Sequence, residues 1–430
     1  MKGIYRDILR IAVPSIITNI TTPLLSLLDV VIVGHLGDQL FIAAIAVGGS
    51  MFNMIYWLFA FLRMGASGLT AQANGASDHE AVAQVLWRGV TVSLAASAIL
   101  ILLQGIVCRL GLSVMDVPSG TDLYAARYFY ILIWGAPAVL LNYTFTGWFL
   151  GQSDARSPMW ISTLINVSNI LISLFLVYGL GLKIEGVAYG TLSAQWIGAV
   201  AGVLVIAFRY QPRRVSLSNV LQRAGLRSYA TVNINILLRT LCLICVTVWF
   251  TRAGASQGSA VLAVNLLLMQ FFSMFSYFMD GFAFAGESIA GNCIGRRDAA
   301  ALSENVRALL RIGTVTALVF SVIYLFAGDF LLNFMTDDAG IRDAASDYVY
   351  WAAVIPMAGF MAFTWDGIFI GATRTRDMLF SMGGAMIVFF AAYFLLSPCL
   401  GNHGLWLAFA LYLAVRGVIL HLLWKRHSPL

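Results

Sequence analysis

Four acidic residues lie inside long apolar runs of this sequence: Asp29, Asp280, Glu287 and Asp366. If such a run crosses a membrane, an ionised carboxylate within it costs at least about 2.5–3.5 kcal/mol on insertion scales. Burial raises the pKa of a carboxyl group and a nearby cation lowers it, so the group can exchange H⁺ for another cation. Reversible binding of H⁺ or Na⁺ is therefore the chemistry that these four acids could perform, and each is weighed below against a structural role.

Two of these acids, Asp280 and Glu287, lie seven residues apart, about two turns along one helix face. Glu287 is near the end of its run, where an ion pair with Arg296 or Arg311 explains it as well as a functional role does. Asp280 lies deeper, and its structural alternative is an ion pair with Arg239 or Arg63. Both acids are candidates for a second cation or substrate site.

The other two acids differ in their surroundings. Asp366 lies in the Gly-rich segment "TWDGIFIG", where a functional and a structural role are equally good explanations. Asp29 is the deepest acid in the first half of the chain. Pro14 and Pro23 precede it, and each interrupts helical hydrogen bonding and frees backbone carbonyls. The sequence therefore favours a cation-binding or proton-binding role for Asp29.

Polar side chains elsewhere in the first half could surround such an acid. Asn166 and Asn169 are three residues apart and share a helix face, with Ser173 one turn further on. Thr191 and Gln195 follow on the next apolar run. Taken singly, such residues usually form hydrogen bonds between membrane helices. Taken together, they could coordinate a cation or hold a protonated acid.

Methionines are candidates for lining a substrate cavity, because their flexible side chains adapt to varied hydrophobic ligands. Met51, Met54 and Met269 are the ones considered, with Arg63 as a charged neighbour within a span. For any one methionine, packing in the core is the alternative.

The composition indicates a membrane protein. Of the 430 residues, 60% are hydrophobic and 11% are charged, whereas an ordinary soluble domain is about 25% charged. A soluble protein this apolar would lack a polar surface, so the expected fold is that of an all-α polytopic membrane protein. The net charge of +6 does not indicate nucleic-acid binding, because the basic residues are scattered between apolar runs.

No motif of an enzyme, a cofactor site or a metal site is visible. The sequence lacks a Walker motif, a GxSxG elbow and an HExxH pair. The pair Cys242 and Cys245 lies in an apolar run without a second pair or a nearby histidine. We therefore expect no enzymatic activity and no bound cofactor, only a coupling ion.

Apolar runs long enough to cross a bilayer, about 20 residues each, recur along the whole chain. Twelve spans are predicted, at 10–34, 40–68, 84–108, 122–150, 158–181, 186–209, 227–252, 258–291, 304–327, 342–371, 378–398 and 403–424. With both termini inside, eighteen Lys and Arg fall in inner segments, five in outer ones and three within spans. The positive-inside rule therefore predicts cytoplasmic termini in a plasma (inner) membrane.

The chain also contains an internal repeat. The thirty residues from Tyr128, "YFYILIWGAPAVLLNYTFTGWFLGQSDARS", align without gaps with the thirty from Tyr348, and eight positions are identical. Six spans per half give both copies the same orientation, an arrangement typical of alternating-access transporters. The predicted domains are a six-helix bundle at 1–208, a cytoplasmic linker at 209–226 and a second six-helix bundle at 227–430.

Several segments resemble one known family. "NITTPLLSLLDVVIVGHLGD" and "FAFLRMGASGLTAQANG" resemble the first two helices of the multidrug and toxic compound extrusion (MATE) family, in particular its DinF-like branch. "GWFLGQSDARSPM", "DGFAFAGESIAGNCIG" and "WDGIFIGATRTRDM" resemble later family segments, so the resemblance covers essentially the whole chain. It implies two six-helix bundles in a V around a central cavity. It also implies export of amphipathic, often cationic compounds in exchange for H⁺ or Na⁺.

The resemblance implies roles for single residues of the first half. Asp29 matches the first-helix aspartate of the family's cation site, to which Tyr128, Asn169 and Thr191 also match. Many relatives carry a second aspartate where this chain has Ser173. One carboxylate is left, which favours a single-proton switch at Asp29 over tight Na⁺ coordination.

The predicted function is a secondary active multidrug exporter driven by H⁺, acting as a monomer among membrane lipids on hydrophobic or cationic small molecules. One alternative is Na⁺ coupling, either at the first-half site or at Asp366, which matches an acidic position of Na⁺-coupled relatives. Another is a flippase for lipids or lipid-linked precursors, which usually has extra spans and a cationic cavity. A channel is disfavoured because the halves differ at polar positions, with Thr146 aligned to Asp366.

Overall fold

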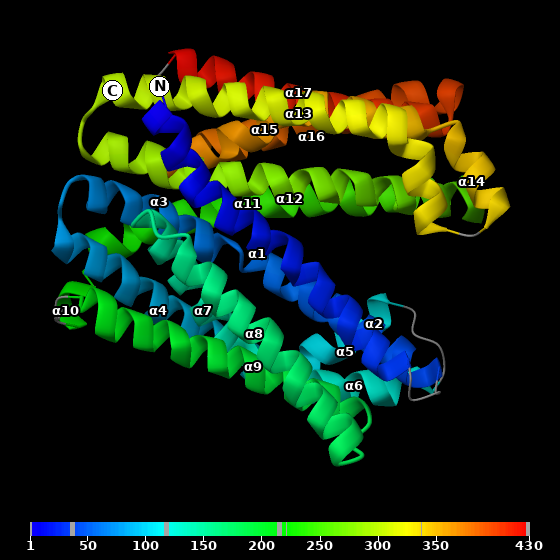
Figure 1. Cartoon of the computed structure of the whole chain (residues 1–430), viewed down its shortest axis with the longest axis horizontal. Helices are drawn as coiled ribbons and strands as arrows, with labels where there is room; N and C mark the ends of the chain where they lie inside the picture. The colour runs from blue at the N-terminus through cyan, green and yellow to red at the C-terminus, as the bar shows by residue number, and fades with distance from the viewer. Residues whose placement is uncertain are drawn as a thin grey trace. The chain divides into compact units, whose positions relative to one another are not determined.

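The computed structural model describes the backbone of residues 2–34, 39–115, 120–212, 217–220, 222–336 and 338–426. Within these ranges it describes all side chains except those of residues 2, 22, 24–34, 39, 217–218, 224, 329 and 339. Every secondary-structure element in the described ranges is a helix (Figure 1). This confirms the predicted all-α fold.

The helices of the first half are α1 (Lys2–Gly34), α2 (Gln39–Leu58), α3 (Phe61–Gly75), α4 (His79–Leu102), α5 (Gln104–Val114), α6 (Thr121–Leu132), α7 (Ala136–Gly151), α8 (Arg156–Leu174), α9 (Ile184–Val205) and α10 (Leu217–Val220). A 3₁₀ turn, η1 (Ile133–Gly135), joins α6 to α7, and π-helical turns η2 (Phe175–Gly179) and η3 (Ile206–Tyr210) end α8 and α9. The α-helices of the second half are α11 (Arg223–Ala255), α12 (Ser259–Gly295), α13 (Ala299–Met335), α14 (Ala339–Ser346), α15 (Val349–Gly371), α16 (Thr375–Leu400) and α17 (Asn402–Arg426).

Eleven of the described helical segments are long and apolar enough to cross a membrane. They correspond in order to the predicted spans from 40–68 to 403–424. The remaining predicted span, 10–34, lies in α1, which is 33 residues long. Large side chains between the ends of these helices are exposed, for example Phe326 at 82% and Phe380 at 71%. Such exposure is stable against lipid, so the chain is a polytopic membrane protein.

The chain packs as two compact units. The N-terminal unit comprises Ile17–Asn233, and the C-terminal unit comprises Met1–Ile16 together with Ile234–Leu430. The chain therefore passes from one unit to the other inside α1 and inside α11. The limits predicted from the sequence, 208 and 227, divide the chain at its polar segment and stay a prediction for the domain boundaries.

The internal repeat appears in the structure as two equivalent helix crossings. In the N-terminal unit α7 crosses α3 so closely that a Cβ at Gly147 would lie 2.1 Å from the carbonyl oxygen of Arg63. In the C-terminal unit α15 crosses α12 in the same way, and a Cβ at Gly367 would lie 2.1 Å from the carbonyl oxygen of Ala283. Both glycine positions and both contact positions are 220 residues apart. Glycine is required at each crossing because no side chain fits between the two backbones.

The same 220-residue spacing relates two helix starts. Asp78 precedes α4 and Asp298 precedes α13, and the Oδ1 of each accepts a hydrogen bond of 2.9 Å from the backbone N–H three residues on. The residues before them, Ser77 and Arg297, have left-handed φ values of 57° and 60°. The repeat therefore extends over the turns after α3 and α12, beyond the thirty positions that the sequence comparison aligned.

The two units differ in the continuity of their helices. In the N-terminal unit the backbone breaks between α2 and α3, at Leu103 between α4 and α5, and at η1 ahead of Pro137. In the C-terminal unit α12 and α13 each run unbroken for 37 residues, and α15 continues through Pro356. The unit that carries Asp29 therefore has the more interrupted helices, and such interruptions free backbone groups that can bind ions and allow bending.

The polar segment after α9 is held against the N-terminal unit by Arg88 of α4. The buried Arg88 donates from Nε to the carbonyl oxygen of Val220, 3.1 Å away, and from Nη2 to that of Asn219, 3.3 Å away. Its guanidinium also lies against Gly225, where a Cβ would be 2.2 Å from Nη2. A cation at the end of α10 satisfies carbonyls that have no helical partner.

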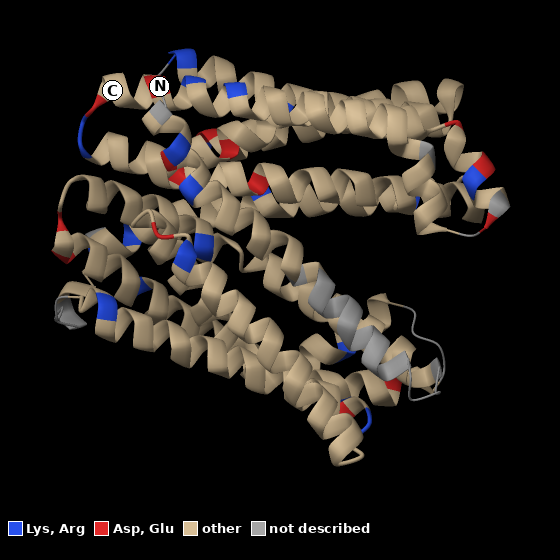
Figure 2. Ribbon diagram, in the orientation of Figure 1, with Lys and Arg blue, Asp and Glu red and all other residues tan. Residues whose placement is uncertain are grey.

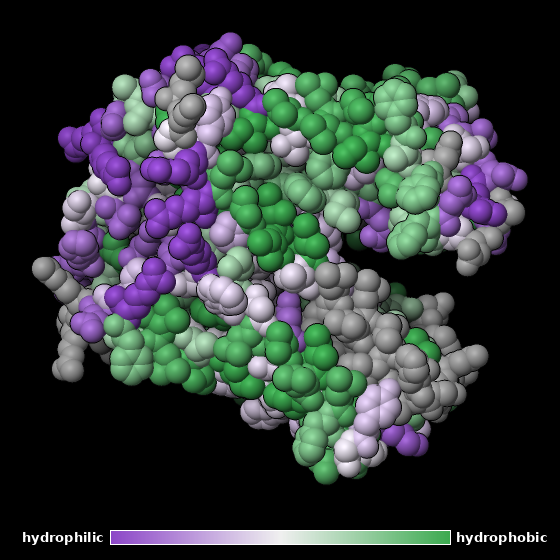
Figure 3. All heavy atoms as spheres, viewed as in Figure 1, coloured by the Kyte–Doolittle hydropathy of each residue, from purple (hydrophilic) through white to green (hydrophobic). Residues whose placement is uncertain are grey.

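Charge is distributed along the helices in the same way within each unit. Lys, Arg, Asp and Glu gather toward the helix ends (Figure 2). On the face shown in Figure 3, hydrophobic side chains cover the middle of each unit and hydrophilic ones lie at its ends. This banding is the pattern expected where helices cross hydrocarbon and end in water.

Candidate functional site

Three residues predicted for the first-half site meet where α8 packs against α9. Asn169 is fully buried on α8, and its Nδ2 donates a hydrogen bond to Oγ1 of Thr191 on α9, 2.7 Å away. Ser173, one turn further along α8, is also fully buried. Gly190 allows the close approach, because a Cβ there would lie 2.1 Å from Ser173 Oγ.

Two oxygen atoms of this group, Asn169 Oδ1 and Ser173 Oγ, are buried and have no hydrogen-bond partner among the described residues. Leaving a buried polar atom unpaired costs about 1–3 kcal/mol, so each such atom calls for a reason, such as an ion or a water. Amide and hydroxyl oxygens bind hard cations and also accept a hydrogen bond from a protonated acid. This part of α8 can therefore hold either species.

The other residues predicted for this site lie on three helices. Tyr128 is buried on α6, and its ring packs against α2, where a Cβ at Gly48 would lie 2.5 Å from it. Asn166 is half-buried on α8, three residues before Asn169. Asp29 lies on α1, but its side chain is outside the described ones. Its partners and its role therefore stay a prediction.

A buried ion cluster occupies the C-terminal unit. Arg239 on α11 and Arg416 on α17 both bind Oδ2 of Asp366 on α15 through their Nη2 atoms. Asp366 is 7% exposed, and the two arginines are 5% and 3% exposed. In the described part of the chain, Asp366 Oδ1 and Arg416 Nε have no hydrogen-bond partner. Asp366 is therefore a bridge between two fixed positive charges.

The acids of α12 lie beside this cluster. Asp280 and Glu287 are both within electrostatic reach of Arg239, and Asp280 is also within reach of Arg416. Glu287 is buried and Asp280 is half-buried. The two arginines therefore interact with three carboxyl groups, all of which are candidate site residues from the sequence.

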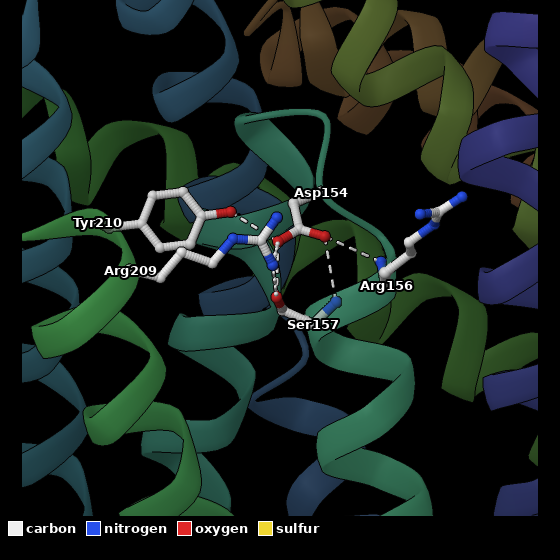
Figure 4. A network of polar contacts seen from close by, with 5 residues as sticks. All are labelled: Asp154, Arg156, Ser157, Arg209 and Tyr210. Atoms are coloured by element: carbon white, nitrogen blue, oxygen red, sulfur yellow. Dashed lines mark hydrogen bonds and ion pairs between the residues drawn. The ribbon is translucent and has the colours of Figure 1, made fainter.

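A second polar network joins the start of α8 to the end of η3 in the N-terminal unit (Figure 4). Asp154 Oδ1 accepts hydrogen bonds from the backbone N–H groups of Arg156 and Ser157, at 3.0 and 3.1 Å. Its Oδ2 accepts from Ser157 Oγ and from Tyr210 Oη, each at 2.6 Å, and lies 3.3 Å from Arg209 Nη1. Asp154 thus caps one helix and anchors the end of another.

This environment lowers the pKa of Asp154. Burial alone would raise it, but the hydrogen bonds from Ser157 and Tyr210 and the charge of Arg209 favour the ionised form and outweigh burial. Asp154 is therefore held as a carboxylate in a structural role, which separates it from an acid that must bind and release protons.

The residues predicted to line a cavity have different environments. Met51 is buried in the core of the N-terminal unit and packs against α5, where a Cβ at Gly111 would lie 2.2 Å from its Cε. Met54 is 44% exposed, and Met269 and Arg63 are half-buried. The position of Met51 favours the packing alternative for that residue.

Arg416 and Asp154 were not among the site residues predicted from the sequence. The signal for Arg416 was available, because it is one of three basic residues within the predicted spans, and such residues pair with buried acids. Asp154 carried no comparable signal. It lies in a polar turn, and its partners Arg209 and Tyr210 are more than fifty residues away in the sequence.

Comparison with known proteins places the chain in a family. The family model MatE matches residues 14–175 and 232–395, one segment in each half. The chain is 36% identical to the DNA damage-inducible protein F of Escherichia coli (strain K12), over 97% of this chain and 91% of that protein. It is 23% identical to a probable multidrug resistance protein NorM of Photorhabdus laumondii, over 98% of this chain and 95% of that protein.

Solved structures show the same fold. A crystal structure of a MATE protein in the straight conformation superposes with a TM-score of 0.87 at 20% identity, covering 98% of this chain and 95% of that one. The eukaryotic MATE transporter AtDTX14 also superposes with a TM-score of 0.87, at 16% identity, covering 99% of this chain and 96% of that one. The predicted fold class is confirmed.

Proposed function

Because the chain belongs to the MATE family of secondary transporters and is similar to DinF, we propose that it exports hydrophobic or cationic organic compounds in exchange for H⁺ by alternating access. The observation that carries the coupling site is the pair of buried oxygens of Asn169 and Ser173 next to Thr191, which have no hydrogen-bond partner among the described residues. These residues belong to the N-terminal unit, as does the stretch of α1 that carries Asp29.

Asp29 is the proton-binding residue in this proposal. Ser173 contributes a hydroxyl where a second carboxylate would favour Na⁺, so one proton is enough to neutralise the acidic charge of the site. A protonated carboxyl is a hydrogen-bond donor, and Asn169 Oδ1 is a buried acceptor without a donor among the described residues. Tyr128 and Asn166 contribute further polar atoms.

Protonation couples to transport through charge and helix bending. The ionised carboxylate attracts a cationic compound, and neutralising it removes that attraction. The prolines of α1, Pro14 and Pro23, each remove one helical hydrogen bond and allow the helix to bend. Proton binding from outside therefore favours the conformation that releases the compound, and proton release to the cytoplasm restores the binding state.

The test is Asp29→Asn in proteoliposomes loaded with a fluorescent organic cation. Under an imposed pH gradient the wild type exchanges the cation for protons, and we expect the variant to lose at least 90% of this exchange. The matched control is Asp122→Asn, which removes an exposed acid on α6 of the same unit and leaves exchange unchanged. Wild-type exchange by the Asp29 variant would refute the proposed coupling residue.

The same vesicles separate the alternatives. A Na⁺ gradient alone, without a pH gradient, drives no exchange if H⁺ is the coupling ion. Exchange under that gradient would favour the Na⁺-coupled alternative at Asp366 or at the first-half site. Movement of labelled lipid between leaflets in place of drug exchange would favour a flippase. In this proposal the protein works as a monomer in the inner membrane with both termini in the cytoplasm.

A further inference from the structure

Asp366 and its two arginines form a charge cluster that the proposed proton site does not use. The three residues come from α11, α15 and α17, and each is more than nine-tenths buried. Both arginines bind the same carboxylate oxygen, Oδ2 of Asp366. Because the three groups are held on three different helices of one compact unit, the contacts are part of its packing.

Two guanidinium groups on one carboxylate determine how it responds to cations. Arginine stays protonated in proteins, so each group is a permanent positive charge. Both favour the ionised form of Asp366, and the three groups together carry a formal charge of +1. A proton or Na⁺ approaching this carboxylate would therefore meet a net positive charge at short range in a medium that screens weakly.

We infer that Arg239 and Arg416 act as tethered cations that take the place of a mobile ion at Asp366. Asp366 is then a positioning residue that binds neither Na⁺ nor H⁺ during transport. The two arginines determine ion specificity by restricting coupling to the N-terminal unit. This inference rests on one part of the proposed function, namely that the chain couples transport to a cation.

The acids of α12 support this assignment. Arg239, Asp366 and Arg416 taken alone have one positive charge in excess. Asp280 lies within electrostatic reach of both arginines and Glu287 within reach of Arg239, so the chain itself supplies two further carboxyl groups beside the cluster. An ionised carboxylate near the two arginines offsets their excess positive charge. A bound cation would increase that charge instead. The charge of Asp366 is therefore already balanced by the chain's own side chains.

Na⁺-dependent thermal stability of the purified protein tests the inference directly. We expect no Asp366-dependent Na⁺ response in the wild type, because its carboxylate is already paired. The double variant Arg239→Met with Arg416→Met leaves Asp366 without a guanidinium partner. We expect the Tm of this variant to rise when NaCl is added and to stay unchanged when choline chloride is added instead. Adding Asp366→Asn abolishes that rise. A Na⁺-dependent rise in the wild type that Asp366→Asn removes would overturn the inference, as would a double variant that folds without a Na⁺ response.

Removing one partner from a buried ion pair is strongly destabilising, whereas replacing all members by apolar residues is often tolerated. The triple variant Arg239→Met, Asp366→Leu, Arg416→Met therefore keeps the inference testable if the double variant does not fold. We expect its proton-driven exchange to lie within about threefold of the wild type, with no response to a Na⁺ gradient. If the triple variant folds but has no proton-driven exchange, the inference is overturned. If the triple variant retains this exchange, the inference is supported. Failure of the proposed function would appear separately, as full exchange by Asp29→Asn.

Discussion

Asp154 shows how one side chain can fix two helix ends. It has five polar contacts, two with backbone N–H groups at the start of α8 and three with side chains, of which those of Arg209 and Tyr210 are at the end of η3. The next residue, Gln211, has a left-handed φ of 45° and turns the chain toward α10. In the second half the aligned residues are Arg374 and Asp377, which pair directly. The turn before α8 is therefore held by the carboxylate of Asp154, and the equivalent turn before α16 by an ion pair between Arg374 and Asp377.

Replacing Asp154 by alanine is predicted to destabilise the protein by about 2–3 kcal/mol, because it leaves Tyr210 Oη and two helix-start N–H groups without their acceptor. The contribution depends on pH in a defined direction. Since the folded-state pKa of Asp154 is lowered, its stabilisation is fully present above the unfolded value of about 3.9 and is lost as pH falls through the lower folded value. Thermal unfolding in detergent at pH 7 and at pH 3 measures both effects.

The control for that prediction is Arg209→Gln. The Arg209 side chain is 62% exposed, so its ion pair with Asp154 is largely screened and contributes at most about 1 kcal/mol. A loss from Arg209→Gln as large as that from Asp154→Ala would contradict the assignment of the stabilisation to the hydrogen bonds.

At the scale of single residues, the sequence predicts buried polar groups better than their partners. Asn169 and Ser173 share a face of α8 because of their i, i+4 spacing, which is readable from the sequence. Thr191 lies on α9, and its place beside Asn169 was expected from the family resemblance. Arg239 and Asp366 were both singled out, yet their pairing depends on the packing of α11 against α15, 127 residues apart. Such contacts are tertiary, and nothing local in the sequence encodes them.

Helix crossings are set by small residues whose role depends on the neighbouring helix. At Gly371 on α15 an added Cβ would lie 2.4 Å from the carbonyl oxygen of Glu287 and 2.9 Å from the backbone nitrogen of Gly291 on α12. At Gly383 on α16 no atom lies within 4 Å of such a Cβ among the described residues. Both glycines are helical, so only packing distinguishes them.

Gly371→Ala is therefore predicted to destabilise the C-terminal unit by about 1–3 kcal/mol, because backbone atoms of α12 cannot move aside as a flexible side chain would. Gly383→Ala is the matched control, and it should be neutral or stabilising by up to about 1 kcal/mol through helix propensity. Thermal unfolding of the two variants in the same detergent compares them. Equal stability of both variants would show that the α12–α15 crossing is not tight.

Helix breaks are the elements that the sequence predicts least well. The span predicted at 40–68 divides into α2 and α3 between Leu58 and Phe61, where neither proline nor glycine occurs. The break at η1 has a local cause, since Pro137 lies in the first turn of α7 and disfavours a helical conformation just before it. The break between α2 and α3 has no comparable local signal in the sequence.

At the scale of the whole molecule, two long helices each belong to both units. The first residues of α1 pack on α12, where a Cβ at Gly281 would lie 2.3 Å from the side chain of Ile16. The first residues of α11 pack on α4, where a Cβ at Gly89 would lie 3.1 Å from Tyr229 Oη. By packing, the chain passes between the units inside α1 and α11, where the sequence carries no boundary signal. The domain limits predicted at the polar segment stay a prediction.

The asymmetry of charge predicts the orientation of the molecule in the membrane. Eighteen Lys and Arg lie in the segments assigned to the inside and five in those assigned to the outside, a bias that the positive-inside rule ties to cytoplasmic termini. Two exposed positions test this in a variant without the five native cysteines: Ala300 at the start of α13, assigned inside, and Lys183 before α9, assigned outside. In intact cells a membrane-impermeant maleimide should label Lys183→Cys and should reach Ala300→Cys only after permeabilisation. The reverse pattern would place both termini outside and would reverse the direction of the proposed proton flow relative to α1.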